Sequence, residues 1–151
     1  MAQYGRLIGI DVGTKWIGVA RTDLLRTVAN PIATYHTSEV FEKLKELVEE
    51  EQVLKFVVGW PLTPGGNEGR AIKMVKKFLT ELEVHFPDME VEKVDERYTS
   101  KEAVRAMVEA GVPKMKRRKS DRVNQAAAAI ILQKYIELSE ANNVRITDRY
   151  V

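Results

Sequence analysis

The chain has 151 residues, of which 44% are hydrophobic and 30% are charged, and its formal net charge is +2. These values fit one globular domain with a single core, and the absence of cysteine excludes a disulfide framework and thiolate metal sites. No apolar stretch reaches the ~20 residues of a membrane span, and the N-terminus lacks a signal-peptide pattern, so we expect a cytoplasmic protein without a membrane partner.

Three strands are expected at the start of the sequence. Apolar runs indicate strands over residues 4–11 and 16–21, and a third is predicted over 27–35. The link "DVGTK" between the first two is short and contains glycine, which is typical of an antiparallel hairpin. Pro31 has no N–H to donate, so it confines the third strand to a sheet edge or a bulge.

Helices and strands alternate in the rest of the sequence. Helical spacing of apolar residues distinguishes the helices from the continuous or alternating strands, and Ser38 is the expected N-cap of the first helix. In order, we expect a helix from 38, a strand over 53–60, a helix over 67–84, a strand over 89–96, helices over 99–111 and 121–139, and a tail over 140–151. The pattern predicts one α/β domain over residues 1–139, with a mixed five-stranded sheet (three antiparallel strands, then parallel ones) and helices on both faces.

Acidic residues stand at the ends of the first and last expected strands. Asp11 ends the first strand, and Asp95 and Glu96 end the last. If these strands are parallel neighbours, the three acids share one edge of the sheet, where their mutual repulsion favours a bound divalent cation. Mg²⁺ prefers such oxygens, and a pair of ions promotes phosphodiester hydrolysis. The alternative is that Asp11 caps the turn before Gly13 and that the other two acids pair with Arg97.

One segment of the sequence is strongly basic. Residues 111–122 contain six lysines and arginines and one aspartate, whereas residues 39–51 contain six glutamates and two lysines. A basic loop of this kind tracks a nucleic-acid backbone through charge alone. A lysine-rich loop that is merely solvated has the same composition, so this alternative stays open.

Four motifs in this order resemble the YqgF/RuvX family, whose members are described as candidate pre-16S rRNA nucleases or Holliday junction resolvase homologues. The resemblance covers about residues 5–137 and implies an RNase H-like fold, nuclease chemistry that depends on Mg²⁺ or Mn²⁺, and trimming of the 5′ end of precursor 16S rRNA. The motifs are "GIDVGTKWIGVA" (9–20), "VVGWPL" followed by "GGNEGR" (57–70), "VDERYTSKEA" (94–103) and "AAAAIILQKYI" (126–136).

The resemblance also implies roles for individual residues. Asp11 corresponds to the metal ligand of the first strand, and the "DER" motif corresponds to Asp95, Glu96 and Arg97. Neighbouring residues of a strand point to opposite faces, and we favour Glu96 over Asp95 as the residue that faces the metal. The expected nucleic-acid contacts are Lys15, Arg97, Lys114, Lys116, Arg117, Arg118 and Lys119.

The last helix departs from the family pattern. The family typically has an aspartate two residues before its alanines, and this sequence has Asn124 there, in "DRVNQAAAA". Asparagine offers a carbonyl oxygen without negative charge, so a cation is held less tightly. Asp121, three residues earlier, either supplies the missing carboxylate or caps the helix; we favour the cap.

Three rival functions remain at this point. The nuclease could resolve branched DNA junctions instead of trimming rRNA. Asn124 motivates a catalytically impaired RNA-binding module. The motif "GIDVGT" also looks like the first phosphate loop of actin/Hsp70-like nucleotide binders, although such proteins use two such domains and this chain lacks a second "DxGG" loop. The expected oligomeric state is a monomer or a weak homodimer.

Overall fold

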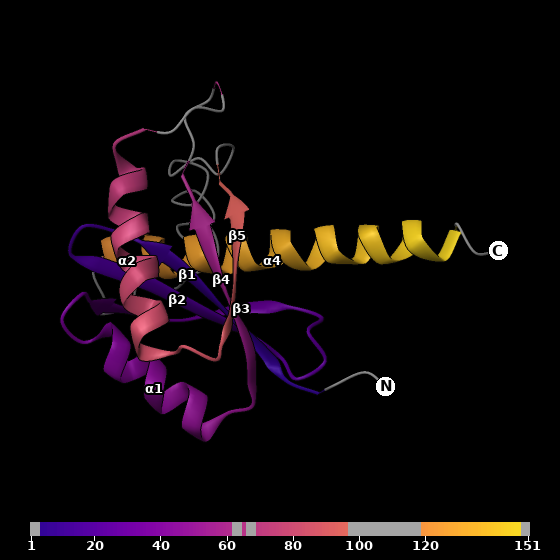
Figure 1. Cartoon of the computed structure of the whole chain (residues 1–151), viewed down its shortest axis with the longest axis horizontal. Helices are drawn as coiled ribbons and strands as arrows, with labels where there is room; N and C mark the ends of the chain where they lie inside the picture. Colours follow the sequence, from indigo (N-terminus) through magenta and orange to yellow (C-terminus); the bar gives the residue numbers. More distant parts are fainter. Residues whose placement is uncertain (1–3, 62–64, 66–68, 97–118, 149–151) are drawn as a thin grey trace.

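The computed structural model describes residues 4–61, 65, 69–96 and 119–148, the last of these ranges by its backbone alone at 119–122 and 141–148. Strands dominate the first half of this part, and a long helix ends it (Figure 1). The elements are β1 (Arg6–Val12), β2 (Trp16–Thr22), β3 (Ala29–His36), α1 (Val40–Glu50), β4 (Val53–Trp60), α2 (Ala71–His85), β5 (Glu90–Asp95) and α4 (Lys119–Asp148).

The five strands form one mixed sheet in the order β3-β2-β1-β4-β5. The first three strands pair antiparallel, and β4 and β5 join them in parallel, which confirms the predicted sheet. Pro31 lies on the edge strand β3, where the register with β2 shifts, as expected for a residue without an N–H. One condition of the sequence argument is not met, because β4 separates β1 from β5.

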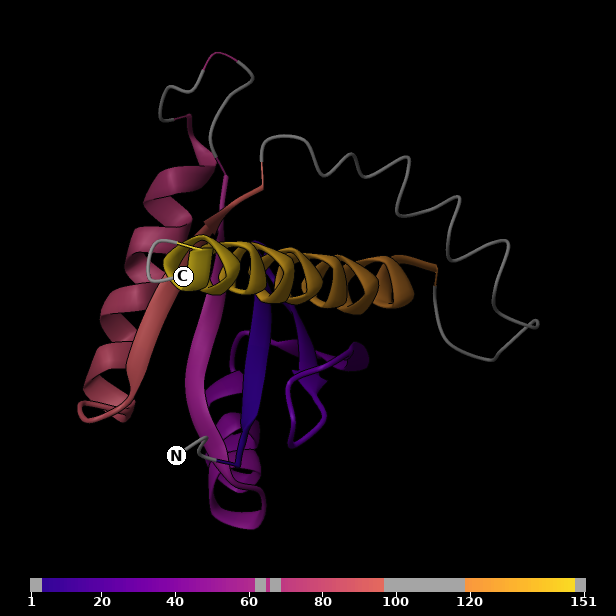
Figure 2. The ribbon, with the colours of Figure 1, turned by 90° about the vertical axis from the view of Figure 1, so that its right-hand side faces the viewer.

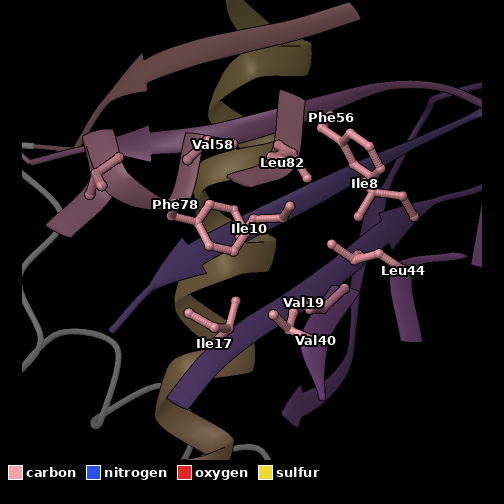
Figure 3. Close-up of a cluster of buried hydrophobic side chains, with 11 residues drawn as sticks. Ile8, Ile10, Ile17, Val19, Val40, Leu44, Phe56, Val58, Phe78 and Leu82 are labelled. Carbon is pink, nitrogen blue, oxygen red and sulfur yellow. The ribbon is translucent and has the colours of Figure 1, made fainter. Parts of the chain in front are cut away.

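Helices cover both faces of the sheet, as predicted. On one face, α1 and α2 enclose a core that includes Phe56 of β4, Leu44 of α1 and Leu82 of α2 (Figure 3). On the other face, Leu7, Val57 and Val94 contribute to a second core beneath α4. Alternate residues of the buried strands therefore serve different cores, which explains why these strands read as continuous apolar runs.

Helix α4 lies across the strands instead of running along them, and its C-terminal part extends beyond the edge of the sheet (Figures 1 and 2). Its inner side is formed by small and branched residues, among them Ala128, Ile131 and Leu132, all of which are fully buried. The buried alanine lets the helix approach the strands closely. Consequently, side chains of β2, β1, β4 and β5 that point to this face meet the same helix.

Several element boundaries differ from the prediction. The N-cap of α1 is Glu39, and Ser38 does not cap the helix because its hydroxyl lies 2.8 Å from Nδ1 of His36. Helix α2 begins at Ala71, later than expected, and α4 continues past residue 139 to Asp148. The helix predicted over 99–111 lies outside the described residues. Among the helices described, none is both long and apolar enough to cross a membrane.

Candidate active site

Asp11 lies near the carboxyl end of β1 with its side chain on the α4 face. In the antiparallel register it stands directly opposite Gly18 of β2, and directly opposed residues share a face of the sheet. A Cβ atom on Gly18 would lie only 2.0 Å from the backbone oxygen of Asn124 in α4. The helix backbone therefore rests on Gly18, immediately beside Asp11.

Glu96 follows β5 directly, and its carboxylate also lies on the α4 face. Its N–H donates to the carbonyl oxygen of Trp60 at 3.1 Å, which continues the parallel pairing of β4 and β5. A Cβ atom on Gly59 would lie 2.9 Å from both Cδ and Oε2 of Glu96, and 2.6 Å from Cδ1 of Ile131. The Glu96 carboxylate thus occupies the space that a side chain at position 59 would fill.

These two acids come together because Gly59 has no side chain. The parallel register of β1 and β4 pairs Ile10 with Val58, so the next position along the strands sets Asp11 beside Gly59. Neighbouring strands are about 4.8 Å apart. By lying over β4, Glu96 spans the strand that separates β5 from β1 and approaches Asp11. Two carboxylates distant in sequence therefore face the same side of the sheet, one on β1 and the other over the adjacent strand β4.

Asp95 lies on the other side of the strand. It pairs with Trp60, whose ring packs against the core beneath α1 and α2. The ammonium of Lys93 lies 4.2 Å from the centroid of that ring. The structure therefore separates the side chains of Asp95 and Glu96, and it brings Glu96 rather than Asp95 to the face that carries Asp11.

Asn124 lies at the end of α4 that is nearest to Asp11. It shares the sheet-facing stripe of the helix with Ala128 and Ile131, which follow at helical spacing. Because α4 begins at Lys119, Asp121 belongs to the first helical turn, and the favoured role of N-cap does not hold. The Asp121 side chain is outside the described atoms.

Of the predicted nucleic-acid contacts, the structure fully describes Lys15 alone. This lysine is exposed in the turn between β1 and β2, and its carbonyl oxygen accepts a hydrogen bond from the Thr37 N–H at 2.9 Å. The turn that follows Asp11 is thereby tied to the segment before α1. For Lys119 only the backbone is described, and the other predicted contacts lie outside the described residues: Arg97, Lys114, Lys116, Arg117 and Arg118.

The donor set on this face suits a hard divalent cation. Within the residues that the structure describes, three His, Asp or Glu side chains do not gather at one point, so the anionic groups available here are Asp11 and Glu96. Mg²⁺ is usually held by one or two carboxylates, and water and substrate phosphates complete its coordination. Two carboxylates that share one face fit this requirement, and Asn124, whose backbone lies on Gly18 beside Asp11, carries a neutral side-chain oxygen.

Three residues of this region escaped the sequence analysis. Gly18 and Gly59 lie inside strands, where glycine often marks a close approach of another part of the chain. That signal was available but did not identify the partner. Lys134, whose ammonium donates to the backbone oxygen of Asp95 at 2.5 Å, lies among apolar residues on the last helix. A lysine among apolar helix residues was the only sign in the local sequence that its side chain binds another part of the chain.

Sequence comparisons show which known proteins this chain is similar to. The family model RuvX, described as Holliday junction resolvase, matches residues 5–138. A candidate pre-16S rRNA nuclease of Salinibacter ruber is 40% identical over 136 residues, which cover 90% of this chain and 95% of that protein. One of Chlorobium luteolum is 36% identical over 137 residues, covering 91% and 97%.

The fold has a counterpart among solved structures. Thermus thermophilus RuvC, in complex with a Holliday junction substrate, superposes with a TM-score of 0.57 at 16% identity, over 89% of this chain and 95% of RuvC. The same protein in another structure gives a TM-score of 0.56 over 90% and 96%. This likeness confirms the RNase H-like fold.

Proposed function

Because the chain belongs to the RuvX family, we propose that it is a metal-dependent nuclease that trims the 5′ end of precursor 16S rRNA. The observation that carries the proposal is the placement of the Glu96 carboxylate over Gly59, next to Asp11 on the α4 face. The names of the curated relatives support the RNA substrate. Such a substrate is consistent with the cytoplasmic location expected from the sequence.

We assign separate roles in this reaction to individual residues of the chain. Asp11 and Glu96 would hold the cation, and Asn124 would offer a neutral ligand. Bound Mg²⁺ or Mn²⁺ supplies an acidified water and positive charge at the leaving oxygen. Lys15, in the turn after Asp11, attracts a phosphate of the substrate to this edge of the sheet. The basic residues after position 113 add affinity along the backbone of the nucleic acid without reading its sequence.

Branched DNA is the second candidate substrate. The family description and the RuvC complex favour it, and both substrates present the same phosphodiester to the carboxylates. An impaired RNA-binding module is the third candidate, since Asn124 lowers the negative charge available for metal binding. The three candidates differ in what is cut, and a single set of assays separates them.

The test uses the full chain with precursor 16S rRNA and with a four-way DNA junction, in Mg²⁺, Mn²⁺ and EDTA. We expect a shortened 5′ end of the RNA with either metal and no product in EDTA. Activity that EDTA does not change, or complete inactivity, contradicts the proposal. Cleavage of the junction alone supports the second candidate. RNA binding without cleavage, together with cleavage by the Asn124→Asp variant, supports the third.

Gly59→Ala is expected to weaken catalysis more than stability. The new methyl group would meet the ends of two flexible side chains, Glu96 and Ile131, so the backbone stays in place while the Glu96 carboxylate is displaced. We expect cleavage to fall by about 10- to 100-fold, the range found when the support of a metal ligand is lost. The melting temperature should fall by less than about 5 °C. A variant with wild-type activity would show that the carboxylate has another position in the working enzyme.

A further inference from the structure

One peptide group beside the site is held from both sides. The N–H of Glu96 donates to Trp60 of β4, and the carbonyl oxygen of Asp95 accepts from the ammonium of Lys134. Both groups belong to the same peptide unit, the one that joins Asp95 to Glu96. In a trans peptide they point in opposite directions, so β4 holds one side of the unit and α4 holds the other.

The contact with Lys134 satisfies a carbonyl group that would otherwise need a further strand as its partner. Because β5 is an edge strand, carbonyl groups that point away from β4 have no neighbouring strand to bind. The Lys134 ammonium takes this place at 2.5 Å in a partly buried position. A hydrogen bond from a charged donor is about twice as strong as a neutral one. The peptide that precedes the Glu96 side chain is therefore fixed in orientation.

Helix α4 is seated firmly enough to deliver Lys134 to this point. Its residues contact β2, β1, β4 and β5 in turn, through the helix backbone at β2 and β1 and through side chains at β4 and β5. In order along α4, Asn124 lies on Gly18, Ala128 on Gly9, Ile131 on Gly59 and Lys134 on Asp95. Ten residues of helix rise roughly 15 Å, which matches the about 14 Å spanned by four adjacent strands. Each strand at the site thus meets its own residue of the helix.

A second anchor secures the helix next to Lys134. The Lys55 ammonium binds the Tyr135 hydroxyl at 2.9 Å and a carboxylate oxygen of Glu92 at 3.0 Å. Burial disfavours both charges, but these hydrogen bonds prevail: they raise the pKa of Lys55 and lower the pKa of Glu92. The ion pair is therefore maintained at neutral pH, and it ties β4 and β5 to the helix one residue beyond Lys134.

We propose that Lys134 is a positioning residue that holds the Asp95–Glu96 peptide, and through it the Glu96 carboxylate, in the orientation that lets Glu96 and Asp11 share one cation. This inference rests on the proposed function. It assigns to the last helix a direct part in arranging the acids of the first and last strands. In this role Lys134 acts through the peptide that it binds and not by contact with substrate or cation.

The test compares Lys134→Met, which removes the donor, with Lys134→Arg, which keeps a charged one. Lys73→Met is the matched control, since Lys73 is exposed on α2 over the other face. The measurements are the affinity of the full chain for Mn²⁺ without nucleic acid, kcat and KM for RNA cleavage, and the melting temperature. We expect Lys134→Met to weaken Mn²⁺ binding by about 10-fold or more and to lower kcat rather than raise KM. Lys134→Arg should restore most of both, and Lys73→Met should resemble wild type.

Three outcomes overturn the inference while the proposed function stands: Lys134→Met with wild-type Mn²⁺ affinity and kcat, a rise in KM alone, or a lower melting temperature with unchanged Mn²⁺ affinity. The second would show that Lys134 contacts the nucleic acid, and the third that its role is only structural. If wild type itself neither binds Mn²⁺ nor cuts RNA, both proposals fail. Should Lys134→Met not fold, Lys134→Gln takes its place under the same criteria.

Discussion

Asp11→Asn is expected to reduce cleavage by more than about 100-fold, beyond the losses seen when an outer-shell partner of a metal ligand is removed. The substitution keeps the size of the side chain and one oxygen but removes the negative charge that a hard cation needs. Asp11 shares the α4 face with the Glu96 carboxylate. Loss of either anion therefore leaves a single carboxylate to hold the ion.

The stability of this variant should not fall along with its activity. Two like charges on one face repel each other in the absence of a cation, so neutralising Asp11 should leave the melting temperature unchanged or raise it slightly. Thermal unfolding in EDTA and initial rates in Mg²⁺ measure the two effects. Asp88→Asn, at an exposed position of the turn between α2 and β5, is the matched control. An unchanged rate in Asp11→Asn would leave Asp11 only a role in capping its turn.

Gly18→Ala is expected to destabilise the fold by about 3 kcal/mol or more, the upper part of the range for overpacked interiors. The new methyl group would lie 2.0 Å from the carbonyl oxygen of Asn124, 2.3 Å from its carbonyl carbon and 2.9 Å from the Gln125 nitrogen. All three atoms belong to the helix backbone, so no rotamer change relieves the clash. The first half of α4 must move away from β2.

For a domain of this size, such a loss lowers the melting temperature by roughly 6–12 °C. Urea or thermal unfolding measures it, and Gly59→Ala is the natural comparison, because the neighbours there are the ends of side chains. The two variants should therefore differ in what they lose: Gly18→Ala mainly loses stability, and Gly59→Ala mainly loses activity. Equal melting temperatures for the two would mean that α4 has more freedom over β2 than its contacts indicate.

Most of the fold could be predicted from local patterns. The apolar runs around Ile8 and Phe56 identify buried strands, and Pro31 correctly predicts an edge. Two of the predicted helix boundaries were wrong. Serine is a common N-cap residue, but the hydroxyl of Ser38 forms a hydrogen bond with the ring of His36. Asn142 and Asn143 resemble the end of a helix, yet α4 continues through them.

The site was predictable in its residue types but not in its assembly. Asp11 and Glu96 could be proposed because carboxylates at strand ends are a recognisable pattern. The intervening position of β4 could not be inferred, nor could the way in which Gly59 makes room for Glu96. These facts depend on contacts between residues far apart in the chain, such as Gly18 with Asn124. Periodicity reports which face a side chain occupies, but not which distant residue meets it.

The position of α4 at the end of the fold has a consequence for the newly made protein. Asp11 is synthesised early, whereas the helix that covers it begins at Lys119. At the usual rate of translation, on the order of ten seconds separate the two. Throughout that interval Asp11 lacks the helix that packs beside it, and the lysine that binds the Asp95 carbonyl is made later still. The groups that form the proposed site therefore come together only after the last helix has been made.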